Sequence, residues 1–228
     1  MKELDVKKVS MANIPVESVP ALLDEEKVAF QPVNTVNWAA YPYCPDVKFR
    51  MAYADNAILI HYKVKENSIR AVAGRDNGPV WEDSCVEFFS VPAEDGVYYN
   101  MECNCAGRLL IGAGAGRNGR RHAPQEVLDK VQRWSSLGRE DFEERIGECS
   151  WEVALVIPYS AFFMHNVTSL GGKTIPTSIN AVISCRLPIS CRGVPLIWKN
   201  RTSTVRSSSE NCISSKREPL SYGNLPAS

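Results

Sequence analysis

The feature that most constrains this chain is a strand-like alternation of apolar and polar side chains, which recurs at roughly ten-residue spacing between residues 48 and 158. In VKFRMAYADNAILIHYKVKE, a turn at Asp55 separates two predicted strands, and the second carries Ile58, Ile60 and Tyr62 on one face. Short strands separated by turn residues are typical of antiparallel sandwiches rather than of alternating strands and helices. The sequence therefore predicts an all-β fold, an antiparallel β-sandwich of immunoglobulin-like or jelly-roll-like type, with one short helix.

Three further segments extend this strand pattern. VWEDSCVEFFSV predicts a strand after the turn at Asn77, and VYYNMECNCAGRLLIGAG predicts a hairpin that closes at Ala106. SWEVALVIPYSAFF predicts a strand that ends at Pro158. The short helix is expected within residues 124–134, PQEVLDKVQRW, where the apolar side chains follow a helical stripe.

Charge is distributed unevenly along the chain. Residues 1–175 carry 19 Lys and Arg against 24 Asp and Glu, whereas residues 176–228 carry 7 against 2. A mildly acidic body disfavours binding to nucleic acid or to an anionic membrane surface. We therefore predict neither a nucleic-acid partner nor a membrane partner, while the sequence leaves the oligomeric state undetermined.

The first twenty residues, MKELDVKKVSMANIPVESVP, lack the apolar core of a signal peptide, and no apolar run approaches the length of a membrane span. The expected location is cytoplasmic, and a leader preceding this sequence would instead indicate a secreted or periplasmic protein. The eight cysteines are accordingly expected to be reduced thiols. Cys103 and Cys105 should share one strand face and pack there, because side chains two apart in a strand point the same way.

The sequence contains no recognisable motif for phosphate binding, metal binding or catalysis. GAGAGRNGRR lacks the spacing of a phosphate-binding loop and indicates a flexible surface loop. His61, His122 and His165 lie in unrelated contexts, without metal-ligand or Ser-His-Asp spacing. Met101 lies in a predicted packed strand, where a methionine is expected in the core. We therefore predict no catalytic residue, no metal ligand and no cofactor from these residues.

Three segments carry a resemblance to a known family. GPVWEDSCVEFFSVP, YYNMECNCAGRLL and WEVALVIPYSAFF resemble, in order and spacing, the family 9 carbohydrate-binding modules and their single-domain relatives, over about residues 30–175. The resemblance implies a β-sandwich that binds plant oligo- or polysaccharides without cleaving them. Calcium occurs in members of this family, so the resemblance leaves a calcium site open.

The resemblance also implies where a sugar would bind. A pyranose presents an apolar face and a rim of hydroxyls, which proteins contact with a flat aromatic ring and with polar side chains. If residues 80–91 form one strand, Trp81, Asp83 and Glu87 share a face while the alternate residues point into the core. In the family a tryptophan stacks on the sugar and a glutamate six positions later binds it, which is the spacing of Trp81 and Glu87. The further rim candidates are Asp83, Asn104 and Arg108. Tyr98, Tyr99 and Asn100 are also rim candidates, although most of these are expected to pack within the sheet.

Two other interpretations of these residues stay open. In a purely structural one, Trp81 caps an end of the sandwich and Glu87 pairs with a nearby arginine. In a catalytic one, Glu82, Asp83 and Glu87 belong to a glycoside hydrolase-associated protein that acts on O-glycosyl compounds in carbohydrate catabolism. Because Glu82 and Glu87 would face opposite sides of a strand, the sequence favours a binding domain over an enzyme.

The strand pattern fails after Lys173. Residues 176–228 hold eleven serines and no sustained alternation, as in a low-complexity basic tail. A second explanation is a frameshift near Ile175. This explanation can be tested by reading the third base of each codon together with the first two bases of the next codon. In that shifted frame, codons for residues 199–213 can encode EPDFHRPEFFGKLYF, and codons for residues 178–192 can encode YKCRDKLPV(A/P)HF(L/V)SW. Both hidden sequences look like the missing end of the family.

We therefore predict that residues 1–175 form the carbohydrate-binding-module-like sandwich, and that residues 176–228 are an aberrant, out-of-frame or disordered tail. The family's second sugar-stacking tryptophan would then be encoded out of frame across Arg192 and Gly193. Trp198 has no family pattern around it and does not replace that tryptophan. We expect this exact chain to lack a closing strand, to be poorly stable and to bind sugar weakly or not at all.

Overall fold

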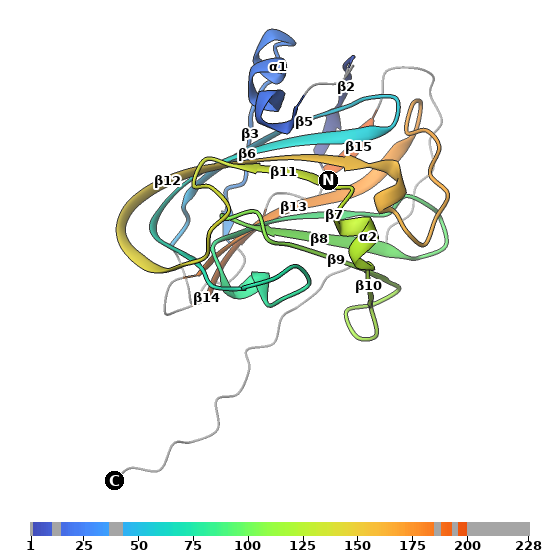
Figure 1. The fold of residues 1–228 in the computed structure, drawn as a ribbon. Helices are drawn as coiled ribbons and strands as arrows, with labels where there is room; N and C mark the ends of the chain where they lie inside the picture. Colours follow the sequence, from blue (N-terminus) through green and yellow to red (C-terminus); the bar gives the residue numbers. More distant parts are fainter. Residues whose placement is uncertain (1, 11–14, 37–42, 185–187, 193–195, 200–228) are drawn as a thin grey trace.

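The computed structural model describes residues 2–10, 15–36, 43–184, 188–192 and 196–199, which form two stacked β-sheets (Figure 1). Sheet A contains, in spatial order, β1 (Lys2–Asp5), β15 (Leu196–Lys199), β13 (Thr174–Ser184), β7 (Cys85–Ser90), β8 (Tyr98–Asn104), β9 (Leu109–Gly114) and β10 (Arg121–His122), with β14 (Pro188–Arg192) paired to β13 and to β4 (Thr35–Val36). Sheet B contains β11 (Gln132–Ser135), β12 (Phe142–Pro158), β6 (Ala57–Ala71), β5 (Asp46–Tyr53) and β2 (Lys7–Lys8), with β3 (Gln31–Pro32) paired to β5. The predicted β-sandwich is confirmed.

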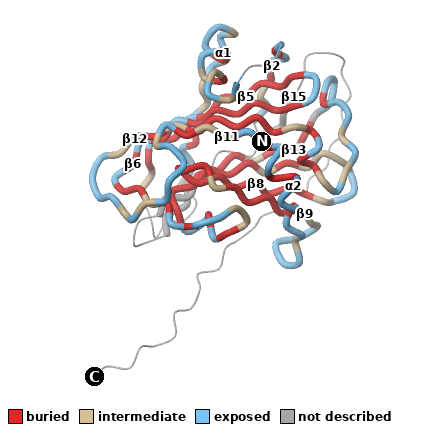
Figure 2. Tube along the Cα trace, in the orientation of Figure 1, coloured by how far each residue is buried: buried red, intermediate tan, exposed pale blue. Residues whose placement is uncertain are grey.

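The core lies between the sheets, where the strands of both layers are buried (Figure 2). The β5–β6 hairpin is antiparallel, with Met51 opposite Ile60, and it turns at Asp55 as the sequence predicts. Ile58, Ile60 and Tyr62 are fully buried on the core side of β6. The two-residue alternation therefore identifies the inner face of sheet B correctly.

The inner face of sheet A follows the same rule. Val86 and Phe88 of β7 point into the core, and Met101 and Cys103 of β8 pack beside them. The β8–β9 hairpin pairs Cys103 with Leu109 and closes around Gly107, next to the predicted turn at Ala106. Met101 and the two neighbouring cysteines are thus core residues, as the sequence predicts.

The helices differ from the prediction in number and length. The expected helix in residues 124–134 is present as α2 (Gln125–Leu128), but residues from Gln132 onward form strand β11 instead. A second helix, α1 (Val19–Glu25), was not predicted; it follows a 3-10 turn (Val16–Ser18) and has a proline in its first turn. Its buried face, Val19 and Leu23, packs on the outer side of sheet B.

The sandwich continues past residue 175. β13 lies between β15 and β7, with Thr177 opposite Ser90 and Ala181 opposite Val86, and Ile179 is fully buried in the core. A strand therefore crosses the predicted boundary at residue 175, whereas the expected absence of the family's closing strand concerns residues 199–213, of which 200–213 lie outside the described residues, and stays a prediction. Paired backbone and a few apolar side chains suffice for a strand, even where a long alternating pattern is missing. The out-of-frame origin of residues 176–228 stays a prediction, and Trp38, Gly193 and residues 200–228 lie outside the described residues.

The glycine-rich segment is also more ordered than expected. Gly112 and Gly114 belong to strand β9, and the Arg120 side chain lies against both of them. No helix within the described ranges is both long enough and apolar enough to cross a membrane.

Candidate functional site

Trp81 is the candidate sugar platform, and its indole is 40% exposed. It lies in a 3-10 turn (Val80–Glu82) rather than in a strand, because the amide N–H groups of Glu82 and Asp83 donate to the carbonyls of Pro79 and Val80. Strand β7 begins only at Cys85. The prediction that Trp81, Asp83 and Glu87 alternate along one strand is therefore wrong for the first two.

The turn nevertheless holds Trp81 beside the outer face of sheet A. Val80 is fully buried and packs in a small apolar cluster with Cys85 and Leu110. Cys85 and Glu87 are two residues apart on β7, and both point away from the core residue Val86. Trp81 therefore stands at one end of the sheet face that carries Glu87.

Glu87 is surrounded by polar side chains on the neighbouring strands. It lies opposite Asn180 of β13 on one side and opposite Glu102 of β8 on the other. The Asn180 Nδ2 donates to Glu87 Oε2 at 3.0 Å, and the Asn100 Nδ2 donates to Glu102 Oε1 at 2.5 Å. We call Glu87, Asn100, Glu102 and Asn180 the outer polar row; all four are buried.

Two members of this row were missed as site residues. The alternation of YYNMECN would have indicated Glu102, since Asn100, Glu102 and Asn104 are the polar positions between core residues. No sequence pattern could have indicated Asn180, because it lies after Lys173, where the alternation of apolar and polar residues is no longer visible. Only strand pairing brings it to Glu87.

Asp83 and Asn104 lie inside the fold, not on a sugar-facing rim. Both are fully buried. Asp83 accepts hydrogen bonds from the backbone N–H of Val72 and Ala73 at 2.9 and 3.0 Å, and from Asn104 Nδ2 at 2.8 Å. The Asn104 Oδ1 accepts from the N–H of Arg108 at 2.7 Å. These bonds occupy both side chains, so they offer no open group to a ligand.

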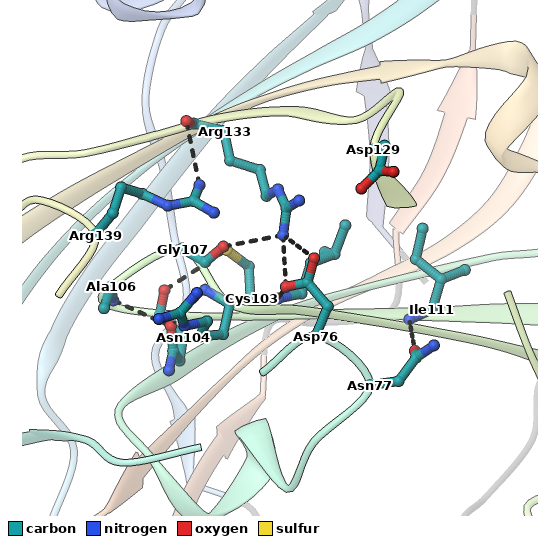
Figure 3. Close-up of polar contacts among 12 residues, drawn as sticks. Asp76, Asn77, Cys103, Asn104, Ala106, Gly107, Ile111, Asp129, Arg133 and Arg139 are labelled. Carbon is teal, nitrogen blue, oxygen red and sulfur yellow. Dashed lines mark hydrogen bonds and ion pairs between the residues drawn. The ribbon is translucent and has the colours of Figure 1, made fainter. Parts of the chain in front are cut away.

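Arg108 belongs to an ion-paired cluster at the end of the sandwich. Its Nε lies 3.1 Å from Asp141 Oδ1, just before strand β12. Close by, Arg133 Nη1 lies 2.7 Å from Asp76 Oδ1 and donates to the Gly107 carbonyl at 3.2 Å (Figure 3). The structure therefore shows Arg108 engaged with sheet B, and it shows no bond from Arg108 to Glu87 among the described contacts.

Gly107 is required where this cluster meets the β8–β9 hairpin. Its φ is +76°, and a Cβ there would lie 2.8 Å from the Arg139 guanidinium. Burial, together with the nearby Arg133, lowers the pKa of Arg139 from its ordinary value. The cluster fixes the end of the hairpin on which Arg108 stands.

The histidines do not converge on a reactive centre. His61 receives the Arg50 Nε at 3.1 Å and lies 2.8 Å from Glu152, on the outer side of sheet B. His165 links Asp95 to the Tyr99 hydroxyl, at 2.9 Å on each side. Burial raises the pKa of Tyr99 to about 12, so this phenol stays protonated and anchors its loop. No group of three potential metal ligands occurs among the residues that the structure describes.

Comparison with known proteins supplies the family. The family model described as "Carbohydrate-binding family 9" matches residues 17–182. This chain belongs to carbohydrate-binding family 9. The family supports carbohydrate binding as the function of this domain.

Two solved structures are similar to this family 9 domain. One, from Bacteroides uniformis and described as "a putative carbohydrate-binding protein", is 50% identical with a TM-score of 0.83, covering 87% of this chain and 99% of that chain. The other, a family 9 module from Caldicellulosiruptor kristjanssonii in complex with glucose, is 12% identical with a TM-score of 0.50, covering 90% of this chain and 100% of that chain. At 12% identity the likeness concerns the fold alone. A search of curated proteins finds no match.

Proposed function

We propose that this domain binds oligo- or polysaccharides of plant-glycan type, without catalysis, by stacking a pyranose on Trp81, while Glu87, which is 2% exposed and accepts a hydrogen bond from Asn180, orders the polar groups beside that platform. The observation that carries the proposal is an exposed indole at the end of a sheet face whose carboxyl and amide groups are otherwise buried. A large apolar ring left in solvent beside ordered polar groups is the combination that a sugar requires.

The known relatives support the same chemistry. The similar Bacteroides protein carries a carbohydrate-binding description at 50% identity, and the Caldicellulosiruptor module was solved with glucose. Glucose and its β-linked oligomers are therefore the first ligands to test, followed by xylo-oligosaccharides.

The geometry favours a binder over a glycoside hydrolase. A glycosidase needs two carboxyl groups that flank the scissile bond. Of the three acids grouped near Trp81, Asp83 is fully buried and bonded to backbone N–H groups, and Glu87 is 2% exposed, so only Glu82 is exposed and no exposed pair of carboxyl groups is formed by these three. Incubation with dyed xylan and dyed cellulose separates the two functions: release of dye at a rate above that of a Glu87→Gln variant would identify an enzyme.

The decisive test is titration calorimetry with cello- and xylo-oligosaccharides, comparing the wild-type chain with Trp81→Ala. Removal of the platform should weaken binding at least thirtyfold, on the scale of the aromatic residues that dominate protein interfaces (about 2 kcal/mol). Trp134→Phe is the matched control, because Trp134 packs on the outer side of sheet B. Equal affinity of wild type and Trp81→Ala would refute the proposed platform.

The same titration tests the frameshift. We expect the chain as given to bind weakly, and a version with the corrected reading frame after Ile175 to bind more tightly, because it regains the family's second tryptophan. Micromolar binding by the uncorrected chain would contradict this expectation. Sequencing of the gene gives an independent answer, since the hypothesis requires that a corrected frame encode the family ending.

A further inference from the structure

We propose that Asp83 is a positioning residue, which sets the direction of the Trp81 indole without touching the sugar. The consequence for affinity rests on the proposed function, whereas the consequence for Trp81 itself does not. The proposal gives a role to a buried carboxylate that the sequence had placed on the rim of the site.

Asp83 joins three segments of the chain through one carboxylate. Its Oδ1 accepts from the Val72 N–H, and its Oδ2 accepts from both the Ala73 N–H and the Asn104 side chain. Val72 and Ala73 follow the end of β6, Asn104 ends β8, and Asp83 itself ends the turn that carries Trp81. The carboxylate therefore ties this turn to both sheets.

Two further hydrogen bonds hold the backbone that follows Trp81 in the chain. Arg70 donates from Nη2 to the Glu82 carbonyl, and the Ser84 N–H donates to the Arg70 carbonyl at 3.1 Å. On the other side of Trp81, Val80 is fully buried. Trp81 itself is 40% exposed and belongs to none of the buried core clusters of the described residues, so we infer that its direction depends on this backbone.

The hydrogen-bond pattern makes the carboxylate difficult to replace. The three hydrogen-bond partners of Asp83 are N–H donors, each of its two oxygens receives at least one of them, and the Arg70 Nε lies 3.7 Å from Oδ1 as a fourth, ion-paired partner. In Asp83→Asn, the amide nitrogen would face a donor whichever way the side chain is turned. A buried donor without an acceptor is costly, so the turn should shift to relieve it.

Asp76 offers a matched control at the same end of the sandwich. It is also a loop aspartate, and it accepts from the Leu109 N–H at 2.9 Å and from Arg133 (Figure 3). It bonds no residue of the Trp81 turn among the described contacts. Asp76→Asn should therefore lower stability without redirecting Trp81.

The test is fluorine NMR of the full chain labelled with 5-fluorotryptophan, with the Trp81 signal assigned by its loss in Trp81→Phe. We expect Asp83→Asn to move or split the Trp81 signal and to weaken affinity for cello-oligosaccharides about tenfold, at a temperature where circular dichroism shows a folded protein. Asp76→Asn should leave the signal in place and the affinity within twofold. A folded Asp83→Asn protein with the wild-type Trp81 signal would overturn the proposal.

Arg70→Met keeps the proposal testable where Asp83→Asn does not fold. Arg70 is partly exposed, so its truncation is milder, and it removes the bond to the Glu82 carbonyl. We expect the Trp81 signal to move in this variant as well, and an unchanged signal would count against the positioning role. A frame-corrected chain that binds none of the sugars, combined with a Trp81 signal that moves in Asp83→Asn, would refute the proposed function and support the positioning role.

Discussion

The outer faces of the two sheets of this sandwich differ in the side chains that they carry and in what covers them. On sheet B, helix α1 covers an apolar area, where Leu23 packs with Leu59 and Val156. The remainder of that face carries paired charges, such as Lys63 with Glu152 at 3.2 Å. On sheet A, the outer polar row is buried, and the indole of Trp81 stands exposed at its end.

This difference separates packing from recognition. An apolar face is covered by any element of suitable shape, and single hydrophobic substitutions there cost stability without a change of function. A row of buried carboxyl and amide groups is ordered by specific hydrogen bonds, and such groups are retained at a cost in desolvation. The outer face of sheet A is therefore where a change of one polar atom should alter binding more than stability.

The largest expected effect is on the sheet B side. Leu23→Ala should lower the free energy of unfolding by about 4 kcal/mol, because it leaves a cavity beneath α1. The affinity for cello-oligosaccharides should stay within twofold of wild type. Urea unfolding and titration calorimetry of the same preparation check both statements; a large loss of affinity in a folded Leu23→Ala protein would break the comparison.

The second effect concerns the interior, between the two faces. Burial raises the pKa of the Glu66 carboxyl from 4.5 to about 7, despite a hydrogen bond from the Trp151 indole. The folded protein thus binds this proton more tightly than the unfolded chain does. The resulting stability is fully present below about pH 4.5 and is lost as the pH rises towards 7, by on the order of 3 kcal/mol.

Glu66→Gln checks this, because the amide keeps an acceptor for Trp151 and does not titrate. The unfolding free energy of wild type relative to the variant should fall between pH 4.5 and pH 7 in urea titrations. A constant difference across that range would show that Glu66 does not carry the pH response.

The third effect is specific to the outer face of sheet A. Glu87→Gln should weaken sugar affinity about tenfold, or about 1.4 kcal/mol, because a neutral amide replaces a charged acceptor. The control is Glu148→Gln on sheet B, where an exposed carboxyl pairs with Lys65 at 3.0 Å. Calorimetry should place the control within twofold of wild type. Equal losses in both variants would remove the distinction between the two faces.

The smallest effect is a pH response on the outer side of sheet B. Burial lowers the pKa of His61, and Arg50 donates to its Nδ1, so the neutral ring keeps its proton on Nε2 facing Glu152. The unfolded chain takes up this proton first, so stability should decline as the pH falls below about 6.5. The decline should be absent in His61→Gln, measured by urea unfolding at pH 7.5 and pH 5.5. A decline of equal size in wild type and variant would assign it to another group.

The sequence predicted those parts of the molecule that depend on local alternation. Ile58, Ile60 and Tyr62 alternate with polar residues, and that periodicity alone assigns them to the core. The Trp81 turn escaped prediction because the turn at Asn77 continues through a 3-10 segment to Glu82, and the strand begins only at Cys85, so Trp81 and Asp83 do not alternate with Glu87. The candidate site was found only in part for the same reason.

Contacts between distant segments account for the remaining differences. Asn180 reaches Glu87 across 93 residues of chain, and no local pattern encodes that pairing. Helix α1 was missed because its seven residues give too short a periodic stretch, although the docked Val19 and Leu23 stabilise it. Asp83 was identified as important, but its partners on β6 and β8 determine what it does.

The first eight residues connect the two sheets in an unusual order. β1 runs parallel to β15 in sheet A, with Lys2 opposite Leu196, and β2 then crosses to sheet B beside β5. During synthesis on the ribosome, Lys2 of β1 is made 194 residues before Leu196, its partner in β15. The edge of β1 therefore stays unpaired until β15 has been synthesised, and it is open to chaperones and to aggregation for that time.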